Sequence, residues 1–212
     1  MEGKIVDKNN ILRGPARVLY YSSTITGTGN ASEISPVEIA DIIPTLSMHG
    51  AVAEGWTDFG AVDGAVTLQR EITTEEDTVE NVNAAIRAYP IKVKDILIAN
   101  FAEVSFENLQ ILWELGAITT NSGATPNEKI IPLSIPQNLT ARAIAFLHSK
   151  PDGKLRCAIF WDVTLGGVAS AVAIAKTPKG LIPVQFNPYP SLTIVDSNSD
   201  PTVGKILEQV SI

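Results

Sequence analysis

The chain has 212 residues, of which 45% are apolar and 18% are charged, and its 16 basic and 23 acidic residues give a formal net charge of -7. This length is sufficient to bury a hydrophobic core, and the low charged fraction argues against a disordered chain. The acidic balance argues against a protein that grips DNA or RNA through phosphates, because such surfaces are normally basic.

The N-terminal part is predicted to hold one strand and one short helix. Residues 16–21 have a strand pattern within an N-terminal arm that spans 1–34. Ser35 and Glu38 have the spacing of a capping box, and a proline occupies the first helical position. A helix of about two turns is therefore expected over 35–43.

Two β-strands are predicted in the middle of the chain, over 69–74 and 91–104. Both are rich in residues that favour strands, and Pro90 marks the start of the second. The second strand would span roughly 45 Å if fully extended, which indicates a bulge or a strong bend. The acidic segment 75–83 between the two strands is predicted to be a mobile loop.

A helix is predicted directly after the second strand. Ser105 is the expected N-cap, residues 106–115 form the body, and Gly116 is the expected left-handed stop. The apolar side chains fall on one stripe that is expected to pack on a sheet face, namely Phe106, Leu109, Leu112 and Trp113. Residues 117–137 are predicted to form a long loop.

The last third of the chain is predicted to be all β. Strands over 140–148 and 155–162 flank a Pro-Asp-Gly turn signal. Further strands are expected at 168–176, 181–186 and 191–195, before a polar C-terminal tail at 196–212. The order predicts a single mainly β domain, an antiparallel sandwich or barrel with a flanking α-helix, a long hairpin and extended loops.

The sequence contains little that indicates an enzyme. Its two histidines, His49 and His148, lack metal-ligand spacing and are expected to be surface or packing residues. Asp58 and Asp63 flank glycines without the order of an EF-hand, and the single cysteine, Cys157, lies in a strand pattern typical of a buried thiol. No motif predicts a nucleotide, metal or cofactor site, and no apolar run predicts a membrane span.

The segment 70–80 is unusually acidic, with five acidic residues against one arginine. The simplest interpretation is a solvated strand end and loop. A second interpretation is that repeated copies of the segment in a symmetric ring create an acidic wall, since each charge is multiplied by the number of copies. Such a wall would repel the phosphate backbone of passing DNA.

The residues Gly-Trp-Thr-Asp-Phe-Gly-Ala-Val-Asp-Gly-Ala-Val at 55–66, followed by strand, acidic segment, strand and short helix, resemble the major tail tube proteins of tailed bacteriophages. The segment 175–186 and the closing hairpins also fit, and the similarity in element order covers residues 15–195. The match is specific within 55–116. Related contractile tails and type VI secretion tubes use the same fold.

The resemblance implies a structural virion protein, not an enzyme, whose copies form hexameric rings that stack into a channel for DNA. The strands at 66–77 and 90–104 would form an inner-wall hairpin whose lumen-facing acidic residues are Glu71, Glu75, Glu76 and Asp77. The loop at 75–83, or the one at 22–32, would reach the adjacent ring, with the contact residues Asp77, Thr78, Glu80 and Asn81.

The same resemblance implies partners and a location. The partners would be further copies of the chain, the tail tip or baseplate, a tail terminator, and a sheath or tape measure protein, with genomic DNA passing through without specific binding. The protein would be made in the host bacterial cytoplasm, reside in the virion tail, bind no cofactor and insert in no membrane.

Three alternatives remain open from the sequence. One is a β-sandwich module that binds a ligand such as carbohydrate through Trp56, Phe59 or Trp161. The second is a hydrolase with a triad that uses His49 or His148. The third is a tail terminator or another structural protein of the tail.

Overall fold

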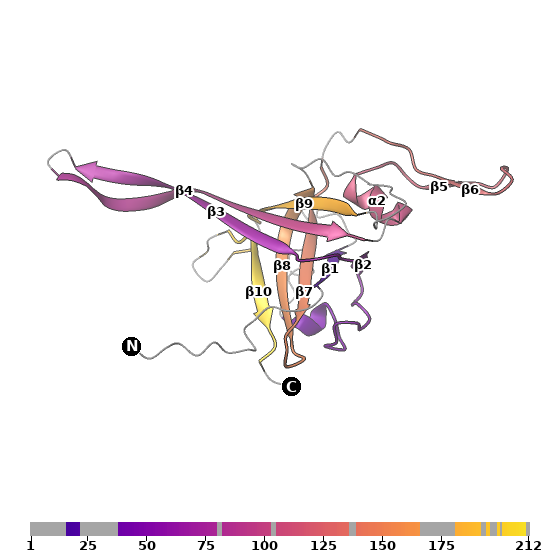
Figure 1. Ribbon diagram of the computed structural model, residues 1–212, viewed down its shortest axis with the longest axis horizontal. Coiled ribbons are helices and arrows are strands. Elements are labelled where there is room, and N and C mark those ends of the chain that lie inside the picture. The colour runs from indigo at the N-terminus through magenta and orange to yellow at the C-terminus, as the bar shows by residue number, and fades with distance from the viewer. Residues whose placement is uncertain are drawn as a thin grey trace.

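The fold is mainly β, as predicted, and its body is built on an eight-stranded antiparallel sheet that curls into a sandwich-like form (Figure 1). The computed structural model describes residues 16–21, 38–79, 82–102, 105–135, 139–165, 181–191, 194–195, 199 and 201–210, with the backbone alone at 61, 76–79 and 82–87. The strands are β1 (Ala16–Tyr21), β2 (Trp56–Ala61), β3 (Thr67–Val79), β4 (Val82–Phe101), β5 (Thr119–Asn121), β6 (Glu128–Ile130), β7 (Arg142–Ser149), β8 (Leu155–Leu165), β9 (Ile182–Tyr189) and β10 (Gly204–Glu208).

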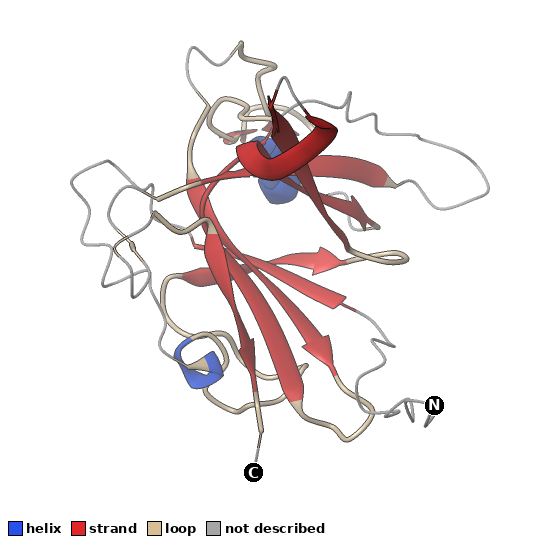
Figure 2. Ribbon diagram, turned by 90° about the vertical axis from the view of Figure 1, so that its left-hand side faces the viewer, coloured by secondary structure: helices blue, strands red, loops and turns tan. Residues whose placement is uncertain are grey.

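The sheet follows the order β2-β1-β7-β8-β9-β4-β3, and β10 adds to β8 as the eighth strand. Two strands pair in succession along one edge of β8. Arg156–Phe160 pair with β10, and Asp162–Leu165 pair with β9. The half with β9, β4 and β3 therefore diverges from the half with β1, β7, β8 and β10 (Figure 2). An isolated bridge between Val62 and Phe101 brings the end of β2 against the end of β4.

The space between the two halves contains the larger hydrophobic core. Side chains of β1, β2, β4, β7, β8 and β9 contribute to this core. Aromatic rings are in contact at its centre, with centroids 5.2 Å apart for Phe59 and Phe101 and 6.3 Å apart for Phe101 and Phe186. Leu112 of the α-helix closes one side of this core. The arrangement follows from strand alternation, since β7 directs Ile144 and Phe146 into it.

A second core lies on the opposite face of β1, β7 and β8. There the odd-numbered residues of β8 from Leu155 to Trp161 meet Ile42 and Ile43 from the segment that precedes β2. Cys157 belongs to this core and is fully buried. The β7–β8 hairpin predicted from the turn signal is confirmed, and Gly153 in that turn has φ of 82°.

The prediction of a two-turn helix at 35–43 is wrong. The described part of this segment contains one turn of 3-10 helix, η2 (Ile39–Asp41), which is capped by Glu38 and Asp41. Residues 35–37 lie outside the described residues, as do the predicted strand at 168–176 and the loop at 22–32. The burial of Ile39, Ile42 and Ile43 against the second core takes precedence over the continuation of a regular helix.

The predicted polar tail at 196–212 is also wrong over its described centre. Residues 204–208 form β10, which pairs with β8 in antiparallel register. Glu208 accepts hydrogen bonds from Arg156 and from Lys150, which fixes the end of the strand. For the predicted strand at 191–195, the described residues show an isolated bridge between Val195 and Pro201.

The helix after β4 is confirmed as α2 (Phe106–Leu112), and the Ser105 hydroxyl accepts a hydrogen bond from the Asn108 N–H at 3.1 Å. The predicted stop at Gly116 is wrong, because Glu114 adopts the left-handed conformation with φ of 52°. Gly116 instead permits a close approach, since a Cβ there would lie 2.5 Å from a Pro132 side-chain carbon.

Three of the four residues in the predicted packing stripe of α2 contact the core. Leu112 is buried in the larger core, and Leu109 and Trp113 pack against it. Phe106 is exposed, because the buried face of the helix begins at Asn108, whose side-chain amide donates to the Phe59 carbonyl. The predicted loop 117–137 contains the short hairpin β5–β6, which projects beyond the body (Figure 1).

Candidate assembly surface

The hairpin of β3 and β4 extends far beyond the body of the protein, on the side opposite β5–β6 (Figure 1). Among the described strands, β3 pairs with β4 alone. β4 pairs with β9 over Leu97–Phe101, so from Val82 to Ile96 its described neighbour is β3 alone. Both long edges of the projecting part thus present backbone N–H and C=O groups, which are templates for pairing with another chain.

The predicted loop at 75–83 is wrong over its described residues, because β3 continues to Val79 and β4 begins at Val82. The bulge predicted in the second strand is confirmed at its start, where the register shifts between Thr73 and Thr74, opposite Lys92 and Pro90. A further shift lies near Thr78, outside the predicted strand. Pro90 is paired with Thr74 beside the first shift, a position where a strand tolerates proline. The connection at 80–81 lies outside the described residues.

The charges of the hairpin differ between its two strands. By sequence, β3 carries a net charge of -3 and β4 a net charge of +2. Glu71 lies directly opposite Lys94, and Thr73 lies opposite Lys92. Because opposed residues share a face of the sheet, Lys94 partly neutralises the acidic segment that the sequence singled out.

An ion pair marks the root of the hairpin, where it leaves the body. The Arg70 guanidinium donates two hydrogen bonds to the Asp95 carboxylate, at 2.7 and 2.8 Å. Asp95 is nearly inaccessible, with 2% of its side chain exposed, whereas 58% of the Arg70 side chain is exposed. These hydrogen bonds raise the pKa of Arg70 above its ordinary value.

The same face of the hairpin carries an exposed apolar row. Its members are between 48 and 61% exposed, and they are Leu68, Ile72, Ile91 and Val93. Ile72 and Val93 are directly opposed across the two strands. Closer to the body this face carries Leu97, which is buried in the larger core. The row therefore continues the core-facing side of the sheet into solvent.

The described residues among those predicted to face a lumen or a neighbouring ring lie on β3 of this hairpin. Glu71 and Glu75 are exposed on β3. Glu76, Asp77 and Thr78 lie on β3 in the part described by its backbone, and Glu80 and Asn81 lie outside the described residues. Sequence reasoning missed Lys92 and Lys94, because their register opposite the acidic strand requires a continuous hairpin.

Other candidate residues do not assemble into a site. His49 is exposed in a turn and His148 lies near the end of β7. Asp58 pairs with Arg17, and burial raises the pKa of Cys157 to about 12. Within the described ranges, no three His, Cys, Asp or Glu side chains are grouped to hold a metal ion. In that same part of the chain, no helix combines the length and apolar character needed to cross a bilayer.

The aromatic side chains proposed as a ligand platform are buried. Phe59 and Trp161 are at most 2% exposed, and Trp56 lies in the second core. These three residues therefore do not form an exposed aromatic surface. No protein-family model and no curated protein sequence matches this chain.

Proposed function

We infer that the chain is a self-assembling structural subunit whose copies form stacked rings, as in the tail tube of a bacteriophage. The observation that carries this proposal is the projecting β3–β4 hairpin, whose two long edges pair with no further described strand and which carries an exposed apolar row. Soluble monomers rarely leave a long flat edge and an apolar face uncovered, because both promote association. Further copies of the same chain are the partners that would cover them.

The exposed apolar row allows the free energy of association to be estimated. Complete burial of one large apolar side chain contributes about 1.5–3 kcal/mol, so burying the exposed half of four such side chains contributes roughly 3–6 kcal/mol. Association itself costs an estimated 4–15 kcal/mol in lost freedom of motion. One such contact is therefore weak, and stable assembly is expected only when several contacts close a ring at sufficient protein concentration.

The two edges of the hairpin are electrostatically complementary. If the acidic β3 edge of one copy lies beside the basic β4 edge of the next, opposite charges meet at every interface. An interface between two different edges is heterologous, and heterologous contacts produce closed rings or open filaments. The hairpins of a ring would then form a continuous β-lined channel without open edges.

The proposal includes the passage of DNA through this channel in the virion tail, with the tail tip, terminator and sheath or tape measure proteins at its ends. Glu71 and Glu75, exposed on β3, would keep the wall from binding phosphates. Tail terminators and other ring-forming tail proteins belong to the same proposal, since they too assemble through repeated copies.

A mixing experiment tests the edge-to-edge arrangement. One variant carries Glu71→Lys and Glu75→Lys, and the second carries Lys92→Glu and Lys94→Glu. Each alone places like charges on both edges, so its assembly measured by light scattering should fall at least tenfold in low salt.

Mixing the two variants should restore assembly, because each acidic edge again meets a basic edge of another copy. The charges within each chain are unchanged by mixing, so an effect on folding of the single hairpin could not be rescued in this way. Assembly of both separate variants at the wild-type level would contradict the proposed arrangement.

A further inference from the structure

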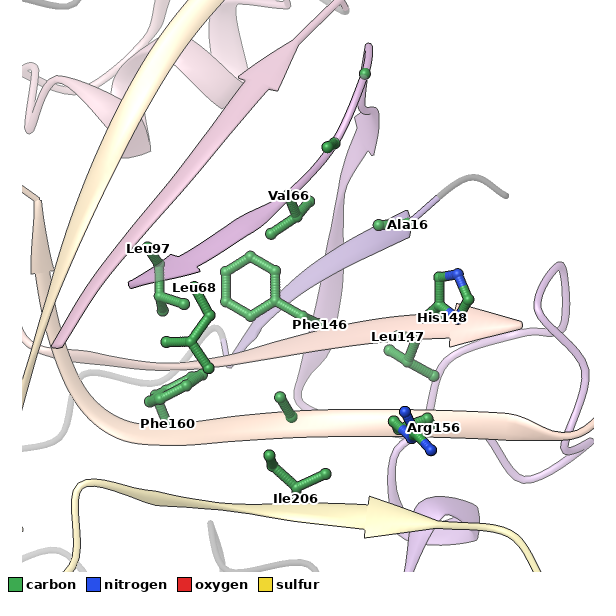
Figure 3. Close-up of a pocket in the computed structure, with 13 residues that line it drawn as sticks. Ala16, Val66, Leu68, Leu97, Phe146, Leu147, His148, Arg156, Phe160 and Ile206 are labelled. Carbon is green, nitrogen blue, oxygen red and sulfur yellow. The ribbon is translucent and has the colours of Figure 1, made fainter. Parts of the chain in front are cut away.

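An apolar hollow opens between the two diverging halves of the sheet (Figure 3). Its volume is about 310 Å³. Leu68 and Leu97 from the β3–β4 side face Phe146 and Phe160 from the β7–β8 side, and Ile206 of β10 forms the outer lip. Ile206 is 65% exposed and Leu68 is 48% exposed, so the hollow is open to solvent and continuous with the apolar row of the hairpin.

The chemistry of the hollow favours an aliphatic occupant. Its charged end is formed by Arg156, whose guanidinium donates two hydrogen bonds to the Glu208 carboxylate at 3.0 and 2.6 Å. That positive charge is matched within the chain, so it gives no strong preference for an anion. An apolar cavity of ~150 Å³ accommodates one benzene ring, so the hollow has room for about two branched aliphatic side chains.

The chain itself presents two such side chains on a segment that we term the strap, residues 131–135. Leu133 is 78% exposed and Ile135 is 93% exposed. The strap is held in place, because Gly116 donates a hydrogen bond to the Pro132 carbonyl at 3.2 Å and Ser134 donates to the same carbonyl at 3.0 Å. The second bond closes a three-residue turn with Leu133 at its apex.

The strap does not fill the hollow of its own chain, because none of residues 131–135 lines it. The strap is held at Gly116, which follows α2, whereas the hollow is lined by residues of β3, β4, β7, β8 and β10. Filling the hollow with a strap therefore requires two copies of the chain. The fit of size and apolar character between strap and hollow identifies a second copy as the occupant.

We propose that Leu133 and Ile135 of one copy insert into the hollow of a neighbouring copy. This contact deepens the proposed function and rests on it, since it requires the chain to self-assemble. It differs from the hairpin contact in using the strap of one copy, although Leu68 belongs both to the apolar row and to the lining of the hollow. The contact is heterologous, so it links copies in one direction, as stacking or ring closure requires.

Disulfide cross-linking between two different copies tests this contact directly. One full-length variant carries Ile135→Cys and the other carries Ile206→Cys, both at exposed positions. Mixed under mild oxidation, they should form a heterodimer, because a disulfide needs Cα atoms within about 7 Å. The native Cys157 is fully buried and does not compete.

The matched control replaces Ile206→Cys by Val210→Cys, which is 82% exposed and lies outside the hollow. The Ile135–Ile206 combination should yield at least tenfold more cross-linked heterodimer than the control combination. Equal yields from the two combinations would overturn the proposal.

A second test does not depend on cysteine chemistry. Leu133→Asp with Ile135→Asp should leave the folded subunit intact, because both side chains are exposed, and should raise the concentration needed for assembly at least tenfold. Leu139→Asp, at the next exposed apolar position, is the control and should leave that concentration unchanged. An unchanged concentration for the double variant would contradict the proposal.

The outcomes separate this inference from the proposed function. Rings or tubes without the specific cross-link would refute the strap contact and leave the tube proposal standing. The specific cross-link in linear chains, without rings or tubes, would support the strap contact and count against the tube. Neither assembly nor cross-link would refute both.

Discussion

The ion pair at the root of the hairpin leads to an asymmetric prediction for two single substitutions. Arg70→Ala leaves the Asp95 carboxylate, 2% exposed, without the guanidinium that donates two hydrogen bonds to it. Asp95→Ala instead leaves a guanidinium that is 58% exposed and can be hydrated where it stands. Removing the exposed partner should therefore destabilise the protein more than removing the buried one.

The magnitudes follow from burial. Breaking a fully buried ion pair costs about 3–5 kcal/mol, and the half-exposed arginine reduces this to about 2–3 kcal/mol for Arg70→Ala. Asp95→Ala should cost about 1 kcal/mol, as expected for the loss of a partly solvated pair. The double substitution should resemble Asp95→Ala alone, because no buried carboxylate then remains to be stabilised.

Urea unfolding of the full chain, at a concentration where wild type is monomeric, measures these differences. The slope of unfolding free energy against urea should be the same in all variants, since the surface exposed on unfolding is unchanged. A larger loss of stability for Asp95→Ala than for Arg70→Ala would refute the reasoning. Equal effects of all three variants would also refute it.

Four further predictions concern other described residues. Burial raises the pKa of Cys157 from 9.0 to about 12, so the unfolding free energy should fall as pH rises above 9, by up to ~1.4 kcal/mol per pH unit. In urea titrations at the same pH values, the unfolding free energy of Cys157→Ala should fall less. Burial also raises the pKa of Asp162, so charging it opposes folding at neutral pH. Asp162→Asn should therefore stabilise at pH 7, and the gain should vanish in acid, where aspartate is already protonated; a larger gain in acid would contradict this. Ser105→Ala removes the α2 cap and should cost about 1 kcal/mol in thermal unfolding, whereas no loss would mean that the cap is dispensable. Assemblies that contain the Glu71→Lys, Glu75→Lys variant, with wild type as the majority subunit, should retain DNA at low salt and release it as salt rises. If assemblies of wild type alone retain as much DNA, an acidic channel is excluded.

The strands of the body could be predicted from the sequence. β9 and much of β8 alternate between buried and partly exposed residues, whereas β1 and β7 are continuous apolar runs that are buried on both faces. Both patterns are typical of strands. The helix α2 was recognisable because Ser105 caps it and its apolar residues recur at helical spacing. Its exposed Phe106 was misjudged because a stripe does not reveal where the buried face begins.

The hairpin and the last strand could not be predicted in full for a physical reason. The hairpin residues 67–75 and 88–94 are exposed on both faces, so acidic residues and Pro90 replace the apolar alternation that marks a half-buried strand. β10 has an equally weak signal, since Ile206 is exposed and Glu208 binds basic side chains at the surface. Both segments are strands because of their partners, β3 with β4 and β10 with β8, which only the fold specifies.

The strap and the hollow could not be predicted from the sequence, because neither corresponds to a sequence motif. The hollow arises where β8 divides its edge between β9 and β10. The strap keeps its exposed position because the Gly116 N–H, just after α2, donates a hydrogen bond to the Pro132 carbonyl and the two residues are in close contact. Both features depend on contacts between segments that are distant along the chain.

Negative-stain electron microscopy of the purified full chain over a concentration series tests the central claim most directly. The account predicts rings or tubes with an open channel, whose abundance rises with protein concentration and falls in the mixing variants when each is alone. Compact monomers at every concentration, with the hairpin folded as described, would contradict it.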